Sequence, residues 1–247
     1  MHVYLPTMHD LQKPFNLSLL GVMNSTTAWN LSSLRSYIRA HCKDKEHLLE
    51  LVSSIDRSNR IFVYHMTSAR DAMKHFFSPG EANLESETLL AMLGGSERQD
   101  EFEWQKVISE AHLIGCLHTA RGLWDIYGQL LNALVATAPL SIKDCDIVRV
   151  AKVLPASPLR DRVNSMLSGY WFGYLSAFIN VTKHRQLIRH STSISFEEDR
   201  AGVQVGAFEY KGQAFTKQWD VEVLQGAIEV KNEAITCGRE LNAYLGI

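Results

Sequence analysis

The chain has 247 residues, of which 46% are apolar and 21% are charged, proportions typical of a globular protein with its own core. Its formal net charge of −2 excludes a generally basic surface, so any contact with nucleic acid has to come from a local patch. There is no N-terminal leader pattern, no apolar stretch long enough for a bilayer and no C-x-x-C pair. We therefore expect a cytoplasmic protein without a membrane segment.

Helical spacing of apolar residues extends over most of the chain. It predicts helices over residues 27–40, 45–77, 86–93 and 98–136. Ser96–Gln99 has the S-x-x-Q form of a capping box at the start of the fourth helix. Ser157 followed by Pro158 is a good N-cap and first-turn pair, and it predicts a further helix that runs to about Arg189.

The spacing changes from helical to alternating after this helix. Val203 and Val205 alternate with polar neighbours, and residues 208–215 predict two strands about a turn at Lys211-Gly212. Asp220 is expected to cap the last helix.

These elements predict one domain of the mainly α class over residues 1–247. We expect an antiparallel helical bundle with a small antiparallel β-sheet or hairpin inserted before the C-terminal helix. The expected parts are a core bundle at about 98–190 and 220–246, a hairpin region at 192–218 and additional helices within 1–95.

The long predicted helix at 98–136 contains a row of polar side chains. His118, Asp125 and Asn132 are seven residues apart, a spacing that drifts by only about 20° around a helix. Arg121 lies one turn from the first two. Residues 113–134 include neither Lys nor Glu, so we favour a row that faces into the bundle, with a solvent-facing row as the alternative.

Cationic side chains gather near the end of the next predicted helix. Five of them lie within eight positions, namely Lys183, His184, Arg185, Arg189 and His190. Asn180 shares a helix face with two of them, at spacings of three and four residues. Cations at a helix C-terminus complement its dipole, but five exceed what that effect requires. The cluster indicates a site for a negatively charged group.

Two short sequence motifs in this region resemble motifs of the HEPN superfamily. Arg185-Gln-Leu-Ile-Arg-His190 is similar to its R-x4-to-6-H motif, and Asn180-x-x-Lys-His-Arg185 is similar to a phrase in bacterial HEPN-like proteins. In those proteins the preceding helix carries a similar His…Asp…Asn row, and the resemblance spans about residues 98–190. It implies a helical bundle, a homodimer with the Arg and His near the two-fold axis, and metal-independent RNA cleavage of the kind found in defence and toxin–antitoxin systems.

The resemblance also implies roles for individual residues. His190 would be the acid–base group and Arg185 the phosphate clamp, with His184 as a second candidate imidazole, because an imidazole transfers protons near neutral pH and a guanidinium steadies phosphate charge. The supporting and orienting residues would be Asp125, His118, Asn132, Arg121, Asn180 and Lys183. The expected substrate is single-stranded RNA, with no metal and no cofactor.

Two other interpretations remain open. In the first, the polar residues pair with one another as a buried network, and the protein is a non-catalytic binding or regulatory module. In the second, His118, Asp125 and His184 hold a metal ion, although Arg121 and Lys183 would repel a cation. An antitoxin or regulatory partner is compatible with the first interpretation and with the nuclease.

Overall fold

The computed structural model describes residues 28–74, 76–77, 86–198 and 200–247, and the statements below concern these residues. They form a mainly helical protein with a small antiparallel sheet before the last helix, as expected from the sequence. The helices are α2 (Leu31–His41), α3 (Lys45–Ala72), α4 (Ser86–Leu93), α5 (Gln99–Leu134), α6 (Ile147–Val153), α7 (Pro158–Leu167), α8 (Tyr170–His184) and α9 (Asp220–Tyr244), with a short 3-10 turn η2 (Ile142–Asp144).

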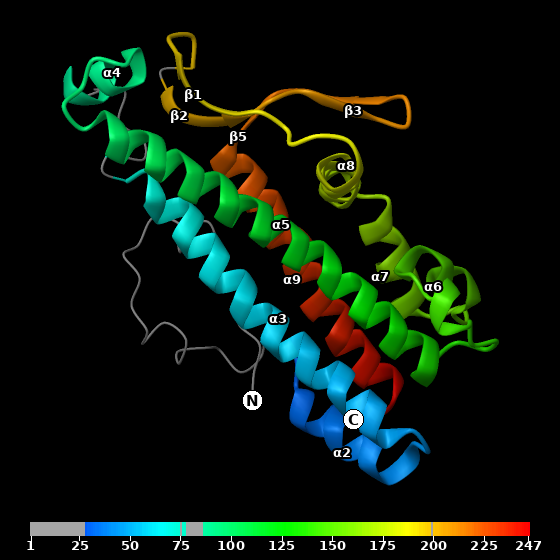
Figure 1. Cartoon of the computed structure of the whole chain (residues 1–247). Coiled ribbons are helices and arrows are strands. Elements are labelled where there is room, and N and C mark those ends of the chain that lie inside the picture. The colour runs from blue at the N-terminus through cyan, green and yellow to red at the C-terminus, as the bar shows by residue number, and fades with distance from the viewer. Residues whose placement is uncertain (1–27, 75, 78–85, 199) are drawn as a thin grey trace.

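Three long helices form the centre of the molecule. Helix α3 packs along α5 more extensively than any other pair of elements, and α9 packs against α5 beside it (Figure 1). The buried side chains of α5 include Leu117, Trp124 and Tyr127. Because these apolar residues recur at helical spacing, α5 buries surface against several helices at once.

Helix α8 lies across this bundle rather than along it (Figure 1). Its apolar face buries Phe172, Tyr174 and Phe178. Trp171 packs on Gly226 of α9, where any β-carbon would collide with the indole. This contact holds the start of α8 against α9.

Two small antiparallel sheets follow α8. Strands β1 (His190–Ser195), β2 (Arg200–Val205) and β5 (Gln218–Trp219) form one in the order β1-β2-β5. Strands β3 (Phe208–Tyr210) and β4 (Gln213–Phe215) form a hairpin. The turn at Lys211 and Gly212 has positive φ at both residues, 51° and 78°, as a tight two-residue hairpin requires. The predicted turn is confirmed.

The structure corrects the predicted helix over 157–189. That segment forms two helices, α7 and α8, and α8 ends at His184. Beyond it, Ile188 is buried and the carbonyl of Arg189 accepts a hydrogen bond from the Gly206 amide at 2.7 Å. These contacts with the sheet hold the chain extended, so that His190 begins strand β1.

Two predicted helix starts also differ from the structure. Helix α5 is capped by Arg98, and the Ser96 hydroxyl accepts from the Arg98 amide at 2.9 Å instead of forming the predicted box. Helix α9 is capped by Trp219, whose amide donates to Glu222 at 3.2 Å, and Asp220 is the first helical residue. Neither change shifts a helix by more than a residue or two.

Candidate functional site

The predicted site residues lie in three places, of which the end of α8 is the most exposed. Lys183, His184, Arg185 and Arg189 are all exposed there. The end of the helix is fixed because the amides of Arg185 and Gln186 donate to the carbonyl of Val181, at 2.9 and 3.1 Å. The sequence cluster therefore becomes a set of cations around a helix terminus.

The β3–β4 hairpin adds to this cluster. The Arg185 guanidinium donates to the carbonyl of Glu209 at 3.3 Å and lies 5.6 Å from the centre of the Tyr210 ring. The Lys211 ammonium lies 5.3 Å from the same ring centre. Two cations thus contact one aromatic ring, an arrangement that cation–π attraction favours.

We call Lys183, His184, Arg185, Arg189, Tyr210 and Lys211 the basic end. In the part of the chain that the structure describes, none of its cations forms an ion pair with a carboxylate. By contrast, Arg57, Arg60 and Arg70 of α3 each pair with an Asp or Glu within two turns. The uncompensated positive charge makes this surface a suitable partner for an anion.

The polar row of α5 faces α8 next to the basic end. Arg121 donates to Asp125 at 2.6 Å and to the Ser176 hydroxyl of α8 at 3.1 Å, and its guanidinium lies 4.9 Å from the centre of the Phe172 ring. The Asp125 side chain remains 46% exposed. The middle of the row is therefore a paired network at the rim of the α5–α8 contact.

His118, one turn before Arg121 on α5, lies near Lys183 of the basic end. Burial lowers its pKa below the usual imidazole value, and the nearby positive charge of Lys183 lowers it further. Asn180 donates to the carbonyl of Ser176 in its own helix at 2.7 Å. The Lys183 ammonium thus acts on the His118 imidazole through its charge, whereas Asn180 pairs within α8.

Asn132 has a different role from the other members of the row. Its side chain donates to the carbonyl of Leu140 at 3.0 Å and accepts from the Leu140 amide at 2.8 Å. It is buried and fixes the segment after α5. This residue stabilises the fold and is outside the contacts made by the rest of the row.

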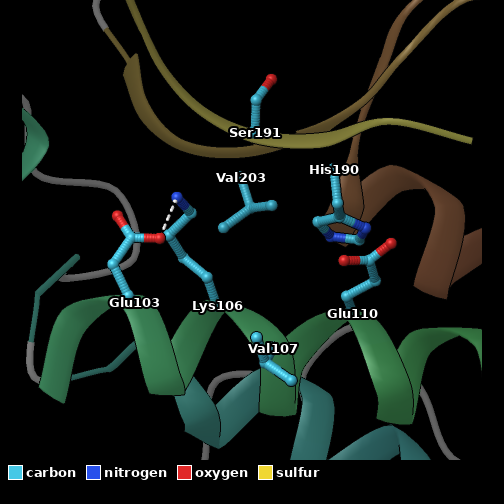
Figure 2. A pocket seen from close by; sticks show the side chains of 7 residues that line it. All are labelled: Glu103, Lys106, Val107, Glu110, His190, Ser191 and Val203. Atoms are coloured by element: carbon cyan, nitrogen blue, oxygen red, sulfur yellow. Dashed lines mark hydrogen bonds and ion pairs between the residues drawn. The ribbon is translucent and has the colours of Figure 1, made fainter. Parts of the chain in front are cut away.

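His190 lies in a third place, a pocket between α5 and the sheet (Figure 2). Burial lowers the pKa of its imidazole to about 4, so the ring is neutral at pH 7. The pocket is lined by Glu103, Lys106, Val107, Glu110, His190, Ser191 and Val203. Arg185, by contrast, contacts the β3–β4 hairpin. The two motif residues thus engage different neighbours.

Two residues of these sites, Tyr210 and Glu110, were not predicted from the sequence. Tyr210 joins the basic end only because the hairpin folds onto α8, although an aromatic residue next to Lys211 at a turn is a usable hint. Glu110 lines the same pocket as His190, 80 positions away in the sequence, and no local pattern marks it.

Among the described residues, no three His, Cys, Asp or Glu side chains are grouped so that they could hold a metal ion. None of the described helices combines the length and the apolar character that a bilayer crossing requires. Comparison of the chain with protein-family models, with curated proteins and with solved structures gives no match.

Proposed function

We propose that this protein binds single-stranded RNA through the basic end and cleaves it there without a metal ion. The observation that carries the proposal is the group of exposed cations at the end of α8, which has no carboxylate partner among the described residues and includes an aromatic ring on the hairpin. A surface that binds single strands has two parts: cations that contact the phosphate backbone, and an aromatic ring on which a base can stack. The resemblance to HEPN domains supports the same substrate.

In this proposal the chemistry belongs to His184 and Arg185. His184 takes the proton of a ribose 2′-hydroxyl, the 2′-oxygen bonds to the adjacent phosphorus, and the bond from phosphorus to the 5′-oxygen breaks. The products are a 2′,3′-cyclic phosphate and a 5′-hydroxyl, whose oxygen receives a proton from an imidazole. Arg185 and Lys183 offset the negative charge that develops on the phosphate. His184 replaces His190 in this role because it is exposed beside Arg185.

A homodimer would supply the second imidazole that such a reaction uses, one as base and one as acid. We propose that the two basic ends meet across a two-fold axis, in a cytoplasmic enzyme of a defence or toxin–antitoxin system that a partner protein restrains. Growth arrest on expression in bacteria, relieved by His184→Ala, is the expected consequence. Normal growth with wild-type protein expressed at a level that binds cellular RNA argues against a toxin.

The binding step is tested by fluorescence anisotropy with a labelled single-stranded RNA. Lys183→Ala with Arg185→Ala should weaken binding by at least tenfold and reduce the salt dependence, by roughly 0.7 in the log–log slope for each lost phosphate contact. The matched control is Arg39→Ala with Lys152→Ala, which removes the same charge from exposed positions elsewhere. Equal losses in both double variants would mean that only net charge matters, and the basic end would not be the site.

The cleavage step is tested in EDTA with end-labelled RNA, by detection of a cyclic phosphate. His184→Ala should abolish cleavage and change RNA affinity by less than about twofold, since one imidazole contributes little to backbone binding. Cleavage that survives in His184→Ala but is lost in His190→Gln would move the acid–base role to His190.

A second candidate function is favoured by the network of Arg121, Asp125 and Ser176. These groups are paired to one another, as expected of a non-catalytic binding or regulatory protein whose polar residues fix the packing of helices. RNA binding by the basic end without any cleavage product would establish this alternative. Asp125→Asn would then lower the free energy of unfolding and leave RNA affinity unchanged.

A further inference from the structure

The pocket around His190 has the size of a small-molecule site. It lies between the N-terminal half of α5 and strands β1 and β2, and its volume is about 180 Å³. A cavity of about 150 Å³ is enough to hold benzene. Its two apolar walls are Val107 and Val203, from α5 and β2.

The charges in this pocket do not cancel. Lys106 turns toward Glu103 and pairs with it at 2.8 Å (Figure 2). The carboxylate of Glu110 forms no ion pair or hydrogen bond with a described residue, and burial raises its pKa although Lys106 partly offsets the effect. One negative charge, half-buried, is therefore left over on the side of the pocket nearest His190.

The imidazole of His190 is likewise without a partner. Its Nε2 atom is buried and has no hydrogen-bond partner within the described residues, and a buried polar atom of this kind ordinarily has one. In Figure 2 the Glu110 carboxylate and the His190 ring lie on the same side of the pocket. No ion pair or hydrogen bond joins the two groups, so with the ring proton on Nδ1 this side of the pocket carries two acceptors without a donor among the described residues.

We propose that this pocket binds a small organic ammonium ion. A protonated primary amine has three N–H donors, which suit the Glu110 carboxylate and the His190 Nε2 atom, and its short alkyl part contacts Val107 and Val203. An anion would meet the charge of Glu110, and a neutral ligand would leave that charge uncompensated. This site is separate from the basic end and does not depend on RNA binding.

The proposal is tested with butylammonium as the probe, by NMR of the valine methyl groups in the full chain. Titration at pH 7 should shift the methyl signals of Val107 and Val203, with a dissociation constant in roughly the millimolar range that so few atoms can supply. Butyrate and 1-butanol at ten times the concentration should leave both signals in place. The variant Glu110→Gln should weaken butylammonium binding at least tenfold, whereas Glu101→Gln, an exposed change on the same helix, should leave it unchanged.

A second variant covers the case in which Glu110→Gln fails to fold. Val107 is 51% exposed, so Val107→Trp fills the pocket without removing a polar group, and it should abolish the shift of Val203. Equal binding of butyrate, or butylammonium binding unaffected by Glu110→Gln or by Val107→Trp, overturns the proposal. A shift caused by Zn²⁺ and not by the amine overturns it as well, in favour of a metal site.

Discussion

Burial of His190 couples the stability of the fold to acid pH. Its pKa in the folded chain is about 4, against roughly 6.5 for an imidazole in an unfolded chain. Between these values the unfolded state binds more protons, so the free energy of unfolding falls as pH falls from 6.5 towards 4, by roughly 3 kcal/mol at most. Urea unfolding followed by circular dichroism at pH 7 and pH 5 measures this. From pH 7 to pH 5, the free energy of unfolding should fall less for His190→Gln than for the wild type.

The control for this experiment is His184→Gln, because His184 is exposed. Its free energy of unfolding should fall as much between pH 7 and pH 5 as that of the wild type. The charged groups facing His190 in the pocket are Glu103, Lys106 and Glu110. His65 and His118 also have pKa values lowered by burial and contribute with the same sign in all three proteins. Identical acid losses in wild type and His190→Gln would show that the imidazole is not buried.

The residues of the basic end illustrate how far single positions could be predicted. Lys183, His184 and Arg185 stand out in the sequence because cations gathered at one helix end exceed what the helix dipole needs. The role of Asn132 was not foreseeable, since its spacing places it in the polar row while its actual partner is Leu140 in the following loop. Helical spacing specifies a face and leaves the partner undetermined.

At the scale of elements, one glycine controls the contact between the two longest helices. A β-carbon at Gly115 of α5 would lie 2.6 Å from the His65 ring of α3. That ring is held in place by a hydrogen bond between the two imidazoles, in which Nδ1 of His65 lies 3.0 Å from Nδ1 of His112. Gly115→Ala should therefore lower the free energy of unfolding by about 1–3 kcal/mol, the usual effect of overpacking.

Gly122 provides the matched comparison on the same helix. A β-carbon there meets nothing within 4 Å, so Gly122→Ala should raise the free energy of unfolding, by about 0.5–1 kcal/mol from helix propensity alone. Chemical denaturation of both variants measures the difference. The opposite order would mean that His65 moves aside without cost.

Hydrophobic periodicity predicted most of the elements. It was wrong where contacts between residues far apart in the sequence determine where an element ends. It found α4, the central part of α5 and the β3–β4 hairpin, whose signals are local. It placed the end of this helix at about Arg189, five residues beyond the observed end at His184. The helix stops earlier because Arg189 pairs with Gly206, a partner that sequence spacing does not reveal.

At the scale of the whole molecule, a lysine lies where three helices meet. Lys231 of α9 has no exposed surface. Its ammonium lies 5.7 Å from the centre of the Phe62 ring of α3 and donates to Asn232 at 3.2 Å, while Cys116 of α5 is close enough to interact electrostatically. Burial holds its pKa well below the usual lysine value, so the unfolded state binds more protons over the interval below about 10.4.

The stability difference between the wild type and Lys231→Met should therefore move in favour of the wild type as pH rises from 7 to 10. The buried thiols of Cys116 and Cys237, whose pKa values burial raises, have the opposite effect on stability, but they are common to both proteins and cancel in the difference. Urea unfolding at three pH values measures it. A difference that does not change with pH would mean that Lys231 keeps an ordinary pKa.

The last helix, α9, also packs against the beginning of the described chain. The Trp29 indole donates to the side chain of Asn242 at 3.0 Å, and Asn242 donates to the carbonyl of Asn30 at 2.9 Å. The Trp29 ring occupies the space that Gly238 leaves on α9. During synthesis on the ribosome, Trp29 emerges long before its partners are made. The bundle therefore completes its core only after α9 has been translated, and nascent chains that lack α9 should depend on chaperones.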